Sequence, residues 1–372
     1  MINLKKSLIF ALFLILLISI YGCKGKKSAE KSMEEIRTGT QGIMLSFMPN
    51  APPDKIVVER GSDNTFDAIL ELRNKGAFPQ PEDGLSAPPG RIYLSGYDPQ
   101  IISFGNTPIQ ELSDKALEGK STINPNGGLD LVTFKGTIDY NNLNVEKYEP
   151  TLLATACYQY LTVAGPSVCI DPDPYSTITQ KKVCQVQGIT LSNQGAPVAV
   201  TKIDEEAFAK KIEFRITIKN VGGGEVIKRD SLNKCGLTGD KIGREDIDKV
   251  LLAELRVGTK ILKCGPFTDR VNAAIEGETG YIRLINGEGV IICRMPSSDY
   301  GESKTSYTTP MTITLIYGYR STAERKIMIK REGSSLDAGT APITSPGGGF
   351  SQPSDLCPQR DPVTGVCIGS FD

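Results

Sequence analysis

The side chains best suited to chemistry in this chain are its nine cysteines. Cys23 follows an apolar N-terminal stretch, and the other eight are spread through the sequence: Cys157, Cys169, Cys184, Cys235, Cys264, Cys293, Cys357 and Cys367. The sequence has no C-x-x-C spacing and no histidine, so we expect neither a zinc site nor a cysteine nucleophile with a histidine base. Without Cys23 the number of cysteines is even, and the N-terminal stretch described below indicates export. This combination predicts disulfides instead.

Two disulfides are predicted individually. Cys357 and Cys367 flank a turn that contains proline and glycine, which indicates a small hairpin closed by a disulfide. Cys169 and Cys184 form the preferred local pair, which would pin the segment between two domains. The first pair leaves three cysteines in or beside each domain, and three cannot pair internally. Either Cys184 bridges toward the second domain, or one thiol in each domain stays free.

Acidic side chains offer a second kind of chemistry. Glu205-Glu206 and Glu245-Asp246 are adjacent pairs in apparent loops and could serve a hydrolase that uses two carboxylates, although solvation is the simpler expectation. The loop carboxylates of Asp171 and Asp173 could supply Ca²⁺ ligands but are also expected to be solvated. We therefore expect no enzymatic activity, no cofactor and no metal.

Four tyrosines form a candidate binding strip: Tyr158, Tyr160, Tyr317 and Tyr319. The members of each pair are two residues apart, so they share one face of a strand. The strip could stack on sugars or on a protein partner. Packing in the core is the more frequent fate of such rings.

The N-terminus indicates location. Lys5 and Lys6 precede fifteen mostly apolar residues, 8–22, and then Cys23. Residues 20–23 resemble the lipobox of lipoproteins, which implies a signal peptide (1–22) and a lipid on Cys23. Tyr21 departs from the small residue usual there, so an uncleaved N-terminal anchor is the alternative. Either form makes the membrane a partner, and residues 23–40 should be a charged, solvated tether.

Composition limits the function classes. The chain has 372 residues, which predicts two domains. Its net charge is -1, so the protein as a whole has no positive electrostatic field that would attract nucleic acid. We expect no nucleic-acid partner.

Alternating apolar residues predict strands. Phe214, Ile216 and Ile218 alternate with polar residues, and Asn220-Val-Gly222 follows with residues that tolerate positive φ. The same design occurs 146 residues earlier at Asn74 and Gly76. Further strands are predicted at 56–59, 66–73, 91–95, 131–140, 152–163, 167–170, 251–257, 312–317 and 326–330, with hairpins over 251–264 and 281–293.

Two further matches support a tandem duplication. Residues 42–46 match 188–192 at the same offset of 146, and Tyr158 and Tyr160 match Tyr317 and Tyr319 at an offset of 159. The sequence predicts an all-β protein of two tandem antiparallel sandwiches, 41–172 and 188–331, joined by a linker at 173–187. A Gly/Ser/Pro-rich flexible linker (332–354) and a disulfide-closed hairpin tail (355–372) follow.

The pattern at 214–224, with a weaker copy at 68–76, resembles the Ig-like modules of the cell-adhesion-related family in prokaryotic surface proteins. Residues 155–175 are similar to archaeal surface proteins. The resemblance implies immunoglobulin-like sandwiches and a surface location, but no ligand. We expect a membrane-anchored, extracytoplasmic lipoprotein that binds a surface or envelope partner without catalysis. An accessory factor for secretion or surface-filament assembly is the alternative.

Overall fold

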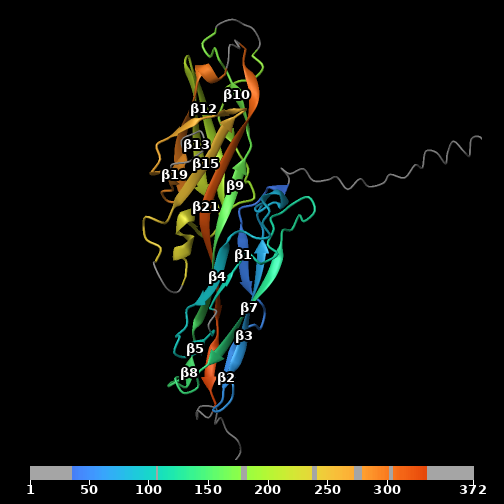
Figure 1. The fold of residues 1–372 in the computed structure, drawn as a ribbon, viewed down its shortest axis with the longest axis vertical. Helices are drawn as coiled ribbons and strands as arrows, with labels where there is room; N and C mark the ends of the chain where they lie inside the picture. Colours follow the sequence, from blue (N-terminus) through green and yellow to red (C-terminus); the bar gives the residue numbers. More distant parts are fainter. Residues whose placement is uncertain are drawn as a thin grey trace, which may run out of the picture. The chain divides into compact units, whose positions relative to one another are not determined.

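The computed structural model describes residues 36–332, apart from 106–107, 177–181, 237–240, 272–278 and 301–304. These residues form an all-β sandwich architecture of mainly antiparallel sheets, which confirms the predicted fold class (Figure 1). Three 3-10 helices interrupt the strands: Pro81–Asp83, Arg229–Lys234 and Ser297–Asp299. The predicted signal peptide (1–22), the linker from 333 onward and the tail (355–372) lie outside the described residues.

The strands of the described residues form four sheets. The first has the order β1 (Ile43–Phe47), β3 (Thr65–Asn74), β7 (Leu129–Ile138) and β5 (Ile102–Ser103). The second has the order β11 (Ile189–Thr190), β12 (Val198–Phe208), β13 (Lys211–Asn220), β20 (Glu288–Pro296) and β17 (Lys263–Gly265). The third places β22 (Met328–Arg331) between β2 (Lys55–Val58) and β8 (Lys147–Tyr148).

The fourth sheet joins the two halves of the sequence. Its order is β18 (Asp269–Val271), β19 (Thr279–Arg283), β15 (Lys249–Val257), β21 (Tyr307–Lys326), β9 (Thr151–Ala164), β4 (Gly90–Ser95) and β6 (Ile109–Glu111). Three short strands extend it: β10 (Ser167–Ile170) and β14 (Glu225–Ile227) pair with β21, and β16 (Lys260–Ile261) pairs with β15. The sandwiches predicted for 41–172 and 188–331 therefore share one sheet, through β9 and β21.

The pairing of β9 with β21 has pseudo-two-fold symmetry. Gln159 lies opposite Gly318, and these residues are themselves equivalent at the offset of 159. The pairs on either side are exchanged by the same offset, because Tyr158 lies opposite Tyr319 and Tyr160 opposite Tyr317. Two equivalent surfaces thus meet each other, as in an isologous dimer interface.

We call the pairing of β9 with β21 the seam between the halves. The strands beside the seam repeat with the same register. Arg73 of β3 lies opposite Leu129 of β7, and Lys219 of β13 lies opposite Glu288 of β20. These two pairs are related by the offsets of 146 and 159 that the sequence matches predict. The sequence evidence for a duplication at the Asn-x-Gly and Tyr-x-Tyr motifs thus corresponds to equivalent positions in the fold.

One predicted match is wrong. Residues 42–46 do not correspond in space to 188–192, because β1 occupies the place of β12 rather than of β11. Ile43 lies opposite Asn74, and Val198 lies opposite Asn220. β11 is an additional edge strand of the second half. Short apolar strands resemble one another, and the two segments share only five residues of pattern.

One predicted hairpin is also wrong. Asn286 and Gly287 have the expected positive φ angles of 53° and 78°. The strands on either side nevertheless lie in different sheets, because β19 pairs with β15 and β20 pairs with β13. This turn therefore carries the chain from one sheet to another. The hairpin predicted over 251–264 forms only as far as β16, which pairs with β15, because β17 pairs with β20 in another sheet. Lys249–Val257 is a strand throughout.

The core follows from alternation along the strands. In β3 the even-numbered side chains from Phe66 to Asn74 are buried and the odd-numbered ones are partly or fully exposed. One buried cluster includes Leu70 of the first half, Phe214 of the second and Tyr160 and Tyr317 at the seam. The core begins before the predicted boundary at 41, because Ile36 is only 3% exposed. Ile36 lies near the end of the predicted tether, and the burial of its apolar side chain stabilises the folded chain.

Candidate functional site

The four tyrosines lie at the seam between the halves and are buried. Their exposed fractions are 0%, 0%, 0% and 2% for Tyr158, Tyr160, Tyr317 and Tyr319. The rings contact one another edge-on or tilted, with centroids 5.8 to 6.4 Å apart. The predicted binding strip is therefore part of the core, because the face of β9 and β21 that carries the four rings is covered.

The tyrosine hydroxyls organise the loops after β3 and β13. Tyr160 donates to Asn74 Oδ1 at 3.1 Å, and the Phe78 N–H donates to the Tyr160 hydroxyl at 3.3 Å. The second half repeats this arrangement: Tyr319 donates to Asn220 Oδ1 at 3.3 Å, and the Gly224 N–H donates to the Tyr319 hydroxyl at 2.7 Å. Burial raises the pKa of Tyr160, so its hydroxyl stays protonated and can donate.

These contacts explain the glycines of the Asn-x-Gly motif. A Cβ on Gly76 would lie 1.9 Å from the Tyr160 hydroxyl, and a Cβ on Gly222 would lie 2.3 Å from that of Tyr319. Neither glycine has a positive φ angle, so the reason expected from the sequence is wrong. The glycines allow the loop backbone to approach a tyrosine closely.

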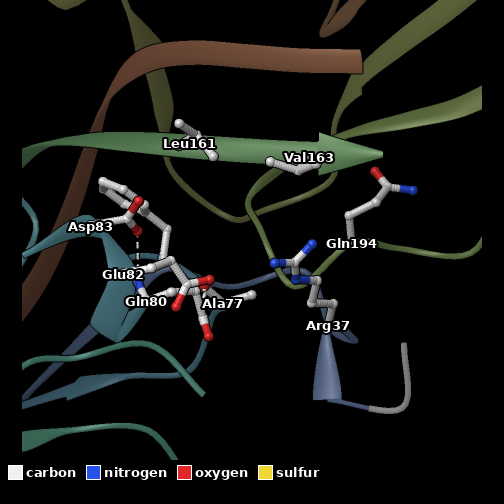
Figure 2. A pocket seen from close by; sticks show the side chains of 9 residues that line it. Arg37, Ala77, Gln80, Glu82, Asp83, Leu161, Val163 and Gln194 are labelled. Atoms are coloured by element: carbon white, nitrogen blue, oxygen red, sulfur yellow. Dashed lines mark hydrogen bonds between the residues drawn. The ribbon is translucent and has the colours of Figure 1, made fainter. Parts of the chain in front are cut away.

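A small pocket of about 190 Å³ lies beside the first of these loops. Figure 2 shows Arg37 and Gln194 on one side of the pocket, Glu82 and Asp83 on the other, and Leu161 and Val163 of β9 between them. Gln194 is fixed by the backbone of Val200, which donates to its Oε1 at 2.9 Å. Within the described part of the chain Arg37 has no ion-pair partner.

A second pocket of about 510 Å³ shares Arg37, Val163 and Gln194 with the first. Its other walls are residues 165–167 and 189–193, from the ends of β9 and β11. We call the two pockets together the Arg37 groove. The groove combines a cation, two carboxylates and an apolar floor, which can bind a segment that carries both charges.

The corresponding position in the other half is a pocket of about 220 Å³ with no charged lining residue. Gly223, Gly224 and Thr322 line it, where the Arg37 groove has Ala77, Phe78 and Val163. The charged residues are thus a property of one half only. Arg37, Glu82, Asp83 and Gln194 were not predicted from the sequence, because no spacing links them and Arg37 was assigned to the tether.

Six of the predicted cysteines form three disulfides. Cys169 pairs with Cys184, which confirms the predicted local bridge. Cys264 pairs with Cys293 inside the second half, and Cys157 pairs with Cys235 across the halves. The cross-half bridge removes the difficulty of three cysteines per domain, and it differs from both alternatives that the sequence left open. Cys23, Cys357 and Cys367 lie outside the described residues.

The acidic pairs do not converge as a two-carboxylate site. Glu205 and Glu206 lie on β12 rather than in a loop, where consecutive side chains point to opposite faces, and only Glu205 is buried. Asp246 is buried and receives hydrogen bonds from Ser231 at 2.6 Å and from Lys234 at 2.8 Å, whereas Glu245 is exposed. The two members of each pair therefore face different surroundings.

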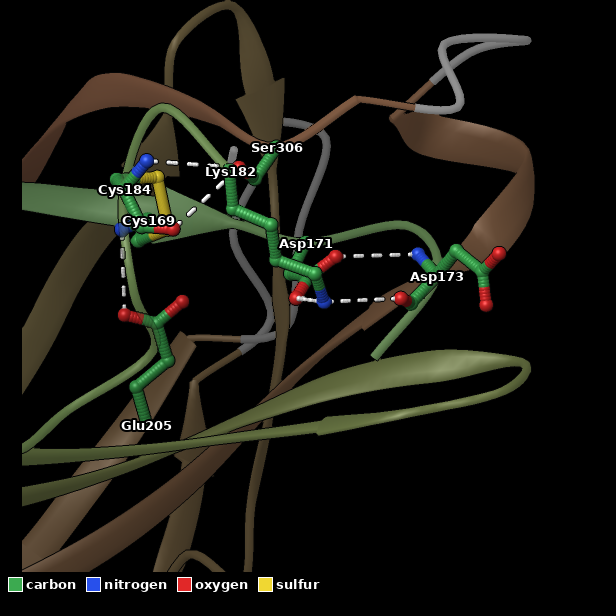
Figure 3. The surroundings of a disulfide bond; sticks show 7 residues. All are labelled: Cys169, Asp171, Asp173, Lys182, Cys184, Glu205 and Ser306. Atoms are coloured by element: carbon green, nitrogen blue, oxygen red, sulfur yellow. Dashed lines mark hydrogen bonds and ion pairs between the residues drawn. A yellow bond between two sulfur atoms is a disulfide. The ribbon is translucent and has the colours of Figure 1, made fainter. Parts of the chain in front are cut away.

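Glu205 and Asp171 lie near the Cys169–Cys184 disulfide (Figure 3). The Cys169 N–H donates to Glu205 Oε2 at 3.2 Å, and Lys182 pairs with Asp171 at 2.6 Å. Burial raises the pKa of Glu205 to about 7, and the charge of Asp171 adds to the rise. Because the Asp171 carboxylate already forms an ion pair with Lys182, it is poorly placed to hold a calcium ion.

Comparison with known proteins adds no family. No family model and no curated protein matches this chain. Across the described residues, the helices are too short and too polar to cross a membrane.

Proposed function

We propose that this protein is a membrane-tethered, extracytoplasmic binding module built from two Ig-like halves, which holds a surface or envelope protein without catalysis. The observation that carries the proposal is the Arg37 groove, where Arg37 faces Glu82 and Asp83 across the apolar surface of β9. A cation and carboxylates on opposite walls favour a partner with complementary charges and reject partners with the reverse order.

The disulfides support the extracytoplasmic location. Cys157–Cys235 and Cys264–Cys293 join buried residues, and Cys169–Cys184 joins β10 to the segment before β11. Such bonds form and persist in oxidising compartments. The tether and the lipid on Cys23 belong to the same proposal, and they rest on the N-terminal sequence.

The intact mass of protein extracted from native membranes tests the location. We expect a chain that begins at Cys23 with added lipid and that gains about two daltons for each disulfide on reduction. A chain that begins at Met1 with all thiols free would remove the lipoprotein and oxidised-compartment proposals together.

Site-specific photo-cross-linking in intact cells tests the groove. A photoreactive residue at exposed Glu82 should capture a discrete partner, and Arg37→Glu should reduce the yield at least tenfold because it reverses the charge on one wall. The same residue at Glu206, which is exposed on β12, is the control and should capture no product that depends on Arg37. Equal capture at both positions would contradict the groove as the binding site.

An accessory role in secretion or filament assembly is the second candidate. It is favoured by one observation: among the described strands β10 pairs with β21 alone, and a strand edge of this kind can accept a client strand.

A further inference from the structure

The pseudo-two-fold symmetry relates β10 to β22, but the two strands have different neighbours. Ile170 of β10 lies opposite Tyr307, and Ile329 of β22 lies opposite Tyr148, which are equivalent pairs at the offset of 159. On its other edge β22 pairs in parallel with β2. Among the described strands, β10 pairs with β21 alone. One half therefore contains a strand that the other half lacks.

The outer edge of β22 is satisfied by the main chain of β2 and its flanks. The Met328 N–H donates to the Asp54 carbonyl at 2.8 Å, and the Glu332 N–H donates to the Val58 carbonyl at 2.9 Å. These bonds are the ordinary ladder of a parallel strand pair. Val58 is fully buried there.

Side-chain carboxylates stand in place of those carbonyls at β10. Cys169 is the counterpart of Met328, and its N–H donates to Glu205 Oε2 at 3.2 Å. Asp173 is the counterpart of Glu332, and its N–H donates to Asp171 Oδ1 at 3.2 Å. Figure 3 shows both carboxylates beside this segment. The two donors are therefore capped by side chains, whereas those of β22 are capped by the backbone of a neighbouring strand.

The sequence explains why only one half fills this position. After β1 the chain contains Asn50, with a φ angle of 60°, and then Ala51-Pro52-Pro53, which end the strand and direct the chain to β2. The counterpart of β1, β12, contains no proline and continues as one strand from Val198 to Phe208 beside β13, with a register shift between Val200 and Lys202. The second half thus keeps one long strand where the first half has two.

A cavity of about 300 Å³ marks the vacant position. It is lined by Ser167, Val168, Cys169, Cys184, Gln185, Gln187, Ile189, Glu205 and Thr308. Glu205 is only 6% exposed, and its Oε1 makes no hydrogen bond with the described residues. An unpaired buried carboxylate oxygen is unfavourable. A ligand that supplies an N–H to this oxygen, or that releases Glu205 to water, removes that cost.

We propose that the edge of β10 accepts an extended segment of a partner protein, which pairs in parallel with residues 169–173 as β2 pairs with β22. The segment's carbonyls replace Glu205 Oε2 at the Cys169 N–H and Asp171 Oδ1 at the Asp173 N–H. This inference rests on the proposed function, because strand addition is one way for a binding module to hold a protein. It assigns a second surface, which adjoins the Arg37 groove at Ser167 and Ile189 but does not include Arg37, Glu82 or Asp83.

The partner's chemistry follows from β2. The segment needs about four residues in extended conformation, with an apolar side chain at the position of Val58. It must not carry an acidic group at the positions that face Glu205 and Asp171, since both are carboxylates. A proline at a residue whose N–H faces β10 excludes binding.

A fluorescent, end-blocked peptide NKIVVQ is the probe, which is the sequence of residues 54–59 with Asp54→Asn and Glu59→Gln so that it carries no acidic group, and the full-length protein is the receptor. Asp54 and Val58 face β22, and strand alternation places Ile56 with them and Val57 facing away. We expect saturable binding by fluorescence anisotropy. N-methylation of Ile56 should weaken it at least tenfold, and N-methylation of Val57, the matched control, should change it less than twofold.

A variant tests whether a peptide carbonyl replaces the Glu205 carboxylate as the acceptor of the Cys169 N–H. Glu205→Ala leaves the Cys169 N–H without its acceptor, so it should bind the peptide about tenfold more tightly, whereas Glu206→Ala should bind as the wild type does. Because Glu205→Ala could unfold locally, a photoreactive peptide is also cross-linked to the wild-type protein. We expect adducts within residues 167–173.

Three outcomes overturn the inference. They are equal binding of the two N-methylated peptides, adducts confined to residues outside 167–173, and a cross-link between β10 and residues 333–372 or a second copy in the absence of peptide. The last result would show that the chain itself fills the edge. Capture at Glu82 in the experiment on the Arg37 groove is independent of this edge, so each proposal can fail while the other stands.

Discussion

The hydroxyl of Tyr160 lies 3.1 Å from Oδ1 of Asn74, which is the last residue of β3. Tyr160 lies on β9, far from β3 in the sequence. Asn74 is fully buried and donates to two carbonyls, those of Phe78 and Leu117. The second half has the same tyrosine–asparagine contact at 3.3 Å, between Tyr319 and Asn220. This contact fastens each Asn-x-Gly loop to the seam.

Tyr160→Phe should therefore destabilise the protein by about 1 to 3 kcal/mol, because it leaves the buried Phe78 N–H and Asn74 amide underpaired. Tyr319→Phe is the matched change and should cost less, because Asn220 is only half-buried. Urea unfolding measures both. Equal free energies of unfolding for the two variants and the wild type would contradict a stabilising role for the contact.

Removal of the Cys157–Cys235 disulfide across the halves should cost more stability than removal of the Cys264–Cys293 disulfide within the second half. Cys157 and Cys235 are separated by 78 residues, and Cys264 and Cys293 by 29. In the loop-entropy description each bridge stabilises by about 2 to 4 kcal/mol, and the longer loop adds about 1 kcal/mol. Paired cysteine-to-alanine variants, compared by urea unfolding, check the order. A larger loss for the 264–293 pair would contradict it.

Glu205 should make folding stability depend on pH near neutrality. Its pKa is raised to about 7 in the folded protein from the ordinary 4.5, so its stabilising contribution is complete below pH 4.5 and is lost as the pH rises through about 7. Glu205→Gln stays neutral, and relative to the wild type it should gain about 1 to 3 kcal/mol between pH 5 and pH 8.

The charged group that acts on Glu205 is Asp171, which raises its pKa and is itself paired with Lys182. The exposed neighbour supplies the control, since Glu206→Gln should give a stability curve parallel to that of the wild type. Unfolding at several pH values distinguishes the two variants. Parallel curves for Glu205→Gln would show that the carboxyl titrates normally.

Asp246 should act in the opposite direction and at lower pH. Burial opposes its ionisation, but hydrogen bonds from Lys234, Ser231 and the Gly243 N–H outweigh burial and lower its pKa to about 2. The stability it contributes is therefore present above pH 3.8 and lost as the pH falls toward 2. Asp246→Asn should cost about 1 to 3 kcal/mol at pH 7 and little at pH 2.

Glu245→Gln is the control for Asp246→Asn, because Glu245 is exposed and adjacent. Acid unfolding followed by circular dichroism gives the midpoints. An unchanged acid midpoint in Asp246→Asn would mean that the ion pair with Lys234 does not contribute to stability.

Local patterns predicted the parts of the fold that depend on local geometry. The alternation of Phe214, Ile216 and Ile218 places β13 correctly, and the spacing of the tyrosines places each pair on one face of its strand. The Cys169–Cys184 bridge was also predictable, because only 15 residues separate its cysteines.

Features that depend on contacts between distant segments were not predictable. The turn at Asn286-Gly287 has hairpin chemistry, yet the choice of partner strand is made by β13 and β15, far away in the sequence. The pairing of Cys157 with Cys235 depends on how the halves meet. Arg37 lines a groove only because the neighbouring Ile36 is buried. Ile36 stands among mostly polar residues in the sequence, so no apolar pattern predicted its burial.

The seam between β9 and β21 has a consequence for mass action. Two free half-chains would have to collide to form this pairing, and its population would depend on their concentration. In one polypeptide the partner strand is always supplied, so the pairing persists at any dilution. Fusion also permits differences that a homodimer forbids, such as Gln159 opposite Gly318, since a change at one position is not copied to the other.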